Sequence, residues 1–137
     1  MIGIVVVTHG NIGNTLIEAA ETIIGHHQDA VVSISIDLKK NADQLREKIA
    51  EGIKKADQGE GVLILTDMFG GTPSNLGYSF LEEGRVEVIS GVNLPLLIKS
   101  ASIRNTTDLG ELARRLEAFG KKSITLASSV LKGNKRI

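Results

Sequence analysis

A histidine and an aspartate each stand at the end of a short apolar run in the sequence. His9 follows residues 2–8, and Asp67 follows residues 61–66. A carboxylate beside an imidazole fixes which ring nitrogen carries the proton, and the other nitrogen then has a free lone pair for nucleophilic attack. Taken alone, His9 is equally compatible with a role in a turn or a helix cap, and Asp67 alone would favour such a role. Together they predict a catalytic pair if the fold brings the two runs side by side.

Two glycine-containing loops follow the same runs and favour a phosphoryl group on the histidine. Gly10 begins the loop of residues 10–15, and Gly70 begins the loop of residues 70–75. Each loop leads into a predicted helix N-terminus, where free backbone N–H groups and the helix dipole favour an anion. The sequence has no G-x-x-x-x-G-K-[ST] motif and no acidic pair at these positions to hold magnesium. We therefore expect the phosphoryl donor to be another phosphoprotein and not ATP.

The elements that must position these residues alternate along the chain. Near-continuous runs rich in β-branched residues predict strands buried on both faces at residues 2–8, 30–36, 61–66 and, more weakly, 85–90. Apolar residues at helical spacing lie between these runs. The boundary signals are Gly25 and Gly84 as left-handed helix ends, Asn41 with Gln44 and Thr72 with Pro73 as N-terminal pairs, and Asn93 and Asp108 as starts of two further helices.

This alternation predicts an α/β fold with a doubly wound, mostly parallel open sheet in the flavodoxin-like strand order 2-1-3-4. In that order the working crevice lies at the carboxyl ends of the first and third strands, where His9 and Asp67 would face each other. Residues 123–131 alternate apolar and polar side chains. They predict a final strand at the sheet edge, or paired with a partner, with one wetter face.

Composition limits the classes of function. The 137 residues are 42% hydrophobic, which predicts one domain over residues 1–137. Sixteen basic residues balance sixteen acidic ones, and the aromatic residues are three Phe and one Tyr, so no nucleic-acid partner is expected. No run has the pattern of a signal peptide or a membrane span, so we expect a cytoplasmic protein without direct membrane insertion. His26 and His27 lack an apparent third ligand, and no metal site or cofactor is predicted.

Three motifs occur in a family-specific order: T-H-G at residues 8–10, D-M-F-G-G-T-P-S-N at residues 67–75, and G-V-N-L-P at residues 91–95. They resemble the enzyme IIA component (EIIA) of the mannose family of the bacterial sugar phosphotransferase system (PTS). The resemblance covers nearly the whole chain. It implies that residues 1–137 form one EIIA type-4, or mannose-family, domain.

The resemblance also implies roles for particular residues. His9 would accept a phosphoryl group from the phosphocarrier protein HPr and pass it to a histidine on enzyme IIB, for sugar uptake or regulation. Asp67 would hydrogen-bond the imidazole. The residues that would line the phosphoryl pocket are Gly71, Thr72 and Ser74, with Asn93 at its edge.

Further implications concern partners. The family forms homodimers, in which the last strand pairs antiparallel with the sheet of the other subunit, and any association with a membrane permease would run through enzyme IIB. Met68 and Phe69 stand beside the proposed site. They are equally compatible with core packing and with a rim on which a protein partner docks.

Three other functions are compatible with parts of the pattern. The phosphotransfer subunit of a PTS-dependent dihydroxyacetone kinase shares this domain type. A response-regulator receiver domain also has an aspartate where Asp67 stands, but here the first strand ends in Thr8 and His9 instead of an acidic pair, and no lysine ends the last predicted strand near Ala127. A flavin-binding module on the same scaffold is disfavoured because few aromatic residues lie near the crevice.

Overall fold

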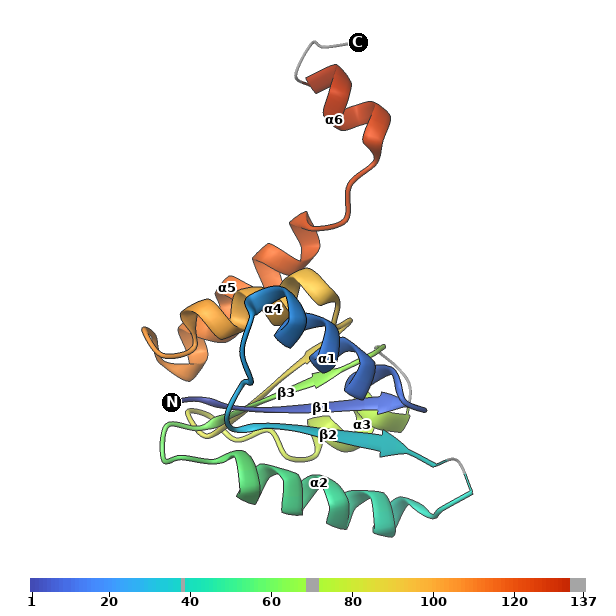
Figure 1. Cartoon of the computed structure of the whole chain (residues 1–137). Coiled ribbons are helices and arrows are strands. Elements are labelled where there is room, and N and C mark those ends of the chain that lie inside the picture. The colour runs from blue at the N-terminus through green and yellow to red at the C-terminus, as the bar shows by residue number, and fades with distance from the viewer. Residues whose placement is uncertain (38, 69–71, 134–137) are drawn as a thin grey trace.

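The computed structural model describes residues 1–37, 39–68 and 72–133. Four parallel strands form one sheet in the order β2-β1-β3-β4, which confirms the predicted order. The strands are β1 (Gly3–His9), β2 (Val31–Ile36), β3 (Val62–Thr66) and β4 (Val86–Ser90). Because all four run in the same direction, their carboxyl ends lie at one edge of the sheet (Figure 1).

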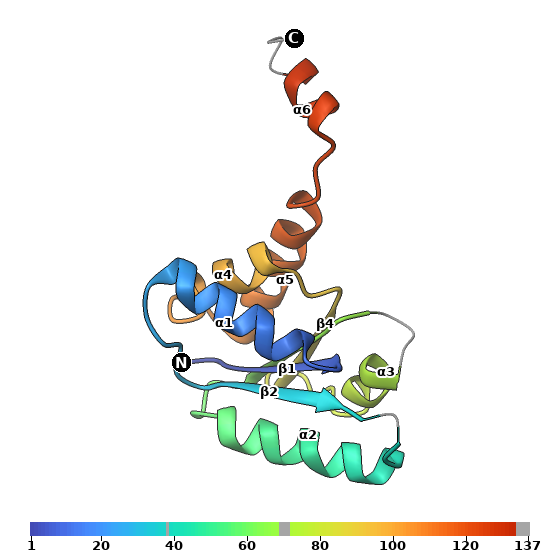
Figure 2. The same ribbon diagram turned by 45° about the vertical axis from the view of Figure 1, so that its right-hand side comes forward.

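Five helices connect and cover the strands on both faces (Figures 1 and 2). They are α1 (Ile12–Ile24), α2 (Ala42–Ala56), α3 (Thr72–Tyr78), α4 (Leu94–Ile103) and α5 (Leu109–Lys122). Helices α1, α4 and α5 pack on one face, and α2 and α3 pack on the other. The molecule is therefore a three-layer α/β sandwich.

The core is divided by the sheet because successive strand side chains point to opposite faces. In β1, Ile4 and Val6 contribute to the core beneath α1, α4 and α5, whereas Val5 and Val7 contribute to the core beneath α2 and α3. All five β3 residues are buried. Burial on both faces explains why these strands have continuous apolar runs in the sequence.

Most predicted helix boundaries are confirmed. The side chains of Asn41, Asn93 and Asp108 each accept a hydrogen bond of 2.8–2.9 Å from the backbone N–H three residues later. Gly25 ends α1 with φ +97°, a conformation that a side chain would disfavour. Gly84 was predicted to end a helix, but α3 already ends at Tyr78. Gly84 instead has φ +77° in the turn before β4.

The prediction of a final antiparallel edge strand is wrong for this structure of the single chain. Residues 127–133 form a short helix, α6 (Ala127–Gly133), and the described residues contain no fifth strand. A strand needs a neighbour for its backbone hydrogen bonds, whereas a helix forms them within itself. Helix α6 projects away from the rest of the molecule (Figures 1 and 2). No helix in the described part of the chain has the length and apolar character needed to cross a membrane.

Candidate active site

The structure brings His9 and Asp67 together at the carboxyl edge of the sheet. His9 is the last residue of β1, and Asp67 directly follows β3, the strand paired with β1. One carboxylate oxygen, Asp67 Oδ2, accepts two hydrogen bonds from His9: one from the backbone N–H at 2.9 Å and one from ring Nδ1 at 2.8 Å. The two contacts fix both the position and the orientation of the imidazole relative to the carboxylate.

The charge on Asp67 determines which nitrogen of the His9 ring carries the proton. Burial raises the pKa of the Asp67 carboxyl, but the hydrogen bonds and the charge contributed by His9 outweigh burial, so the pKa lies below its usual value. Asp67 is therefore ionised at neutral pH and can only accept hydrogen bonds. Nδ1 must consequently carry the proton, which leaves the lone pair of a neutral ring on Nε2. The side chains of His9 and Asp67 are 35% and 14% exposed, so the ring is open to solvent while its carboxylate is nearly covered.

Thr8 helps to position His9 and was not predicted as a site residue from the sequence. Thr8 is fully buried, and its Oγ1 accepts a 2.8 Å hydrogen bond from the backbone N–H of Gly13 in the first turn of α1. This threonine therefore acts as the side-chain cap of α1, because Asn11 at the conventional cap position makes no such bond. It links the strand that ends in His9 to the helix that follows, and no spacing rule for caps would have identified it.

A chain of three hydroxyl groups lies beside Asp67 and was also missed. Buried Thr66 donates from its Oγ1 to Ser90 Oγ at 2.9 Å, and the hydroxyls of Ser90 and Tyr78 lie 3.0 Å apart. The chain ties the ends of β3 and β4 to the last residue of α3. These residues are distant in sequence, so no local pattern connects them.

The other predicted site residues have different placements. Gly10 lies directly after His9 with φ +52°. Asn93 caps α4 and donates to Ser123 Oγ at 3.0 Å, so its role in phosphoryl binding stays a prediction. Met68 is 52% exposed, as a rim position requires. The predictions for Phe69, Gly70 and Gly71, and for the side chains of Thr72 and Ser74, lie outside the described residues.

The two remaining histidines lie at the other end of the molecule. His26 and His27 follow α1 and precede β2, at the amino edge of the sheet. His27 Nδ1 is 2.8 Å from Glu21 Oε2, but the His27 side chain is 77% exposed. No cluster of three or more metal-ligating side chains occurs within residues 1–37, 39–68 and 72–133.

The strand order and the position of the histidine and aspartate pair define a class of protein. A parallel sheet in the order 2-1-3-4, with chemistry at the carboxyl ends of its first and third strands, is a flavodoxin-like doubly wound α/β domain. Residues 3–117 match the family model described as the PTS system fructose IIA component. The chain therefore belongs to the fructose and mannose family of PTS EIIA components, which are phosphotransferases.

Individual relatives agree with this assignment. The chain is 31% identical over 132 residues to the fructose-specific EIIA component of Bacillus subtilis, an alignment that covers 96% of this chain and 90% of that protein. It is 36% identical over 105 residues to the mannose-specific EIIAB component of Escherichia coli, which covers 76% of this chain and 32% of that longer protein. The crystal structure of an EIIA component from Streptococcus agalactiae superposes with a TM-score of 0.84 at 26% identity, covering 94% of this chain and 99% of that one.

Proposed function

We propose that this protein is a phosphohistidine carrier that accepts a phosphoryl group on His9 from phospho-HPr and passes it to enzyme IIB. The observation that carries the proposal is the 2.8 Å contact between His9 Nδ1 and Asp67 Oδ2. This contact leaves Nε2 as the nucleophilic atom of a ring that is 35% exposed. A partner protein can therefore approach the nucleophile, and no cofactor is required.

The chemistry follows from the state of the ring. The Nε2 lone pair attacks the donor's phosphorus, a new N–P bond forms, and the bond between phosphorus and the donor breaks with its electron pair remaining on the donor. No proton has to move, because Nδ1 keeps its hydrogen throughout. The ring becomes positively charged, and the ionised carboxylate of Asp67 stabilises that charge. Transfer to enzyme IIB repeats the same displacement in reverse order.

The surroundings of His9 favour an anion. Helix α1 begins two residues after Gly10, and its first turn has no acidic residue. The positive end of its dipole therefore lies close to the proposed phosphohistidine. Gly70, Gly71, Thr72 and Ser74 are proposed to add further donors. These groups would hold the phosphoryl oxygens while the two proteins are docked.

Reconstitution tests the proposal directly. The protein is incubated with phosphoenolpyruvate, enzyme I and HPr, and the modified peptide is identified by mass spectrometry. We expect a single modification on the peptide that contains His9, stable in alkali and lost in acid. Omission of HPr should abolish the modification, since HPr is the proposed donor. A modification on the peptide that contains Asp67, lost in alkali as an acyl phosphate is, would instead indicate a receiver-like protein and would contradict the proposal.

The chain supplies a matched control. His27 also has Nδ1 at 2.8 Å from a carboxylate, that of Glu21, but it lies at the amino edge of the sheet. We expect His9→Ala to abolish labelling and His27→Ala to leave it unchanged. Equal labelling of His9→Ala and wild-type protein would remove His9 from the proposal.

The acceptor distinguishes sugar transport from the alternative function. A domain of this type also serves as the phosphotransfer subunit of a PTS-dependent dihydroxyacetone kinase. Labelled protein is therefore mixed separately with enzyme IIB and with the dihydroxyacetone-binding subunit of such a kinase. Transfer of the label to enzyme IIB supports the proposed function. In that function the protein works in the cytoplasm, and it associates with a membrane permease only through enzyme IIB. Loss of label to the kinase subunit alone supports the alternative.

We further propose that the protein is a homodimer formed through its C-terminal segment. Apolar side chains gather there without cover from the rest of the chain: Ile124 is 81% exposed, Leu126 68%, Val130 45% and Leu131 46%. Burying such a segment against a second copy would remove apolar surface from water. We expect a dimer in sedimentation velocity and a monomer for the double variant Leu126→Asp and Val130→Asp. A monomeric wild-type protein would contradict this proposal.

A further inference from the structure

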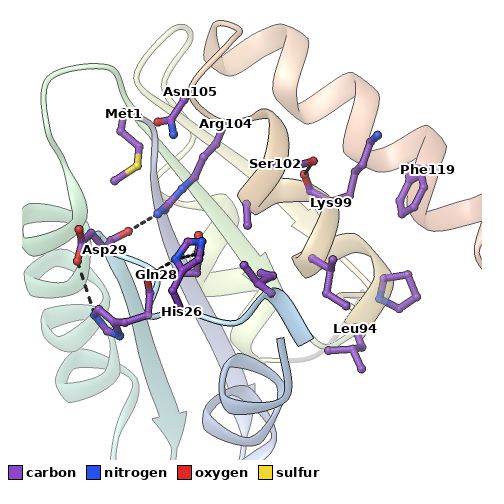
Figure 3. A pocket seen from close by; sticks show the side chains of 15 residues that line it. Met1, His26, Gln28, Asp29, Leu94, Lys99, Ser102, Arg104, Asn105 and Phe119 are labelled. Atoms are coloured by element: carbon purple, nitrogen blue, oxygen red, sulfur yellow. Dashed lines mark hydrogen bonds and ion pairs between the residues drawn. The ribbon is translucent and has the colours of Figure 1, made fainter. Parts of the chain in front are cut away.

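A groove with a volume of about 830 Å³ has neither His9 nor Asp67 in its lining and is not used by the proposed phosphoryl transfer. It runs between the C-terminal end of α1 and helix α4, with Met1 and the loop before β2 at one end and Phe119 of α5 at the other (Figure 3). Since Met1 precedes β1 and His9 ends it, this end of the groove is at the opposite edge of the sheet from His9.

A buried arginine forms part of the wall of this groove. Arg104, directly after α4, is only 2% exposed. Its guanidinium donates to the backbone oxygens of Asp29 and Ala30, where Ala30 has the unusual φ of +56°. Its Nε has no hydrogen-bond partner within the described residues. Arg104 therefore holds the turn before β2 but has unused capacity to donate.

The charge of Arg104 is poorly neutralised. None of the ion pairs formed by residues 1–37, 39–68 and 72–133 includes it. Burial lowers the pKa of the guanidinium, and only the charge of Asp29 opposes that effect. The Asp29 side chain is 81% exposed, and its carboxylate lies 3.7 Å from His27 Nε2. A buried cation without a close anion is costly, so binding of an anion beside it would be favourable.

The other side chains of the groove define an amphipathic site. His26, His27 and Lys99 add basic groups, whereas Asp29 is the acidic residue of the lining. The walls beside α4 are apolar, with Ile24, Leu94, Ile98 and Phe119. The Lys99 ammonium lies over the Phe119 ring, 5.4 Å from its centre. The volume lies within the range of pockets that bind small molecules.

We propose that this groove binds a small organic carboxylate with an apolar body, its carboxylate beside Arg104 and its body along Ile98 and Phe119. The anionic group matches the basic end of the groove, and the apolar body matches the α4 wall. The groove is separate from the His9 site, so ligand binding does not require phosphorylation. A failure to detect binding in the groove therefore does not contradict phosphoryl transfer at His9, and the reverse also holds.

Three probes test separately whether binding needs the anionic group and the apolar body: hexanoate has both, 1-hexanol has only the apolar body, and inorganic phosphate has only the negative charge. Each is titrated into the isotope-labelled full-length protein at neutral pH, and backbone amide shifts are followed by NMR. We expect saturable binding of hexanoate with a Kd on the order of 1 mM, with shifts concentrated at residues 26–30 and 98–105. Hexanol and phosphate should each bind at least about tenfold more weakly, because each has only one of the two features. Equal binding of either probe, or no saturable binding of hexanoate, overturns the proposal.

Substitutions in both parts of the groove test where hexanoate binds, so the test does not depend on the buried Arg104 alone. Arg104→Gln should weaken hexanoate binding by about tenfold or more, but it also removes the contacts to Asp29 and Ala30 and should lower stability. His26→Glu and Phe119→Ala change exposed side chains on the two parts of the groove, and each should weaken binding by several-fold. Lys54→Glu on α2 and His9→Ala should bind hexanoate as wild type does. Unchanged binding by both His26→Glu and Phe119→Ala overturns the proposal.

Discussion

Replacing Asp67 with asparagine keeps the size of the side chain but removes the charge that accepts two hydrogen bonds from His9. These bonds are 2.9 Å and 2.8 Å long and converge on one oxygen. A hydrogen bond to a charged group contributes about 1.5–3 kcal/mol. The ring bond is the one that strengthens as the imidazole gains positive charge, and its loss raises the barrier to transfer. Because the His9 side chain is 35% exposed, solvent screening reduces the effect to roughly 1–2 kcal/mol.

At about 1.4 kcal/mol for each factor of ten, we expect Asp67→Asn to slow phosphoryl transfer by roughly 5- to 30-fold. Rapid-quench measurement of label transfer from phospho-HPr gives this rate in a single turnover. Glu21→Gln serves as the matched control, because Glu21 holds His27 at the same distance of 2.8 Å but far from the reaction. A rate for Asp67→Asn within twofold of wild type, with an unchanged unfolding midpoint, would refute the assignment of Asp67 as the group that stabilises the charged ring.

Three further predictions concern stability. Thr8→Val should lower the free energy of unfolding in urea by about 1–2 kcal/mol, because the buried N–H that Thr8 caps loses its acceptor; a loss below 0.5 kcal/mol would contradict the capping role. The lowered pKa of Asp67 stabilises the fold fully above the pKa of an unfolded carboxyl, which is about 4. The stability advantage of wild type over Asp67→Asn should therefore shrink as the pH falls below that value. An advantage that grows in acid would contradict a lowered pKa. Gly3→Ala should lower the free energy of unfolding by about 1–3 kcal/mol or more, because the added Cβ would lie 2.2 Å from the Ala56 carbonyl oxygen. Gly77→Ala should fold normally, because its added Cβ would have no neighbour closer than 3.6 Å. Equal thermal midpoints for the two variants would show that β1 can move away from α2.

The elements that the sequence predicted well are those with strong local signals. Buried parallel strands need apolar side chains on both faces, so β1 and β3 are visible as continuous runs. Caps depend on residues three positions apart, so Asn41, Asn93 and Asp108 were identified correctly. Alternating helices and strands then leave few topologies, because crossovers between parallel strands are right-handed. The meeting of His9 and Asp67 follows from that topology.

The missed features depend on contacts that a local pattern does not contain. In residues 123–131 the period-two alternation suggested a strand, but Ala127, Val130 and Leu131 also have helical spacing. The conformation of such a short run depends on whether a strand is available to pair with it, and in the described part of the chain no strand lies beside residues 127–133. The hydroxyl chain of Thr66, Ser90 and Tyr78 depends on side chains that approach from three elements. Such a network becomes visible only in three dimensions.

The pairing of β1 with β3 has a consequence during protein synthesis. The histidine and its carboxylate are 58 residues apart in the chain, with β2 and α2 between them. A growing polypeptide that has left the ribosome only as far as α2 therefore has the nucleophile but lacks the anion that orients it. On the proposed function, the emerging domain would become competent for phosphoryl exchange only after its third strand has docked beside the first, so unfinished chains would not take phosphate from the carriers around them.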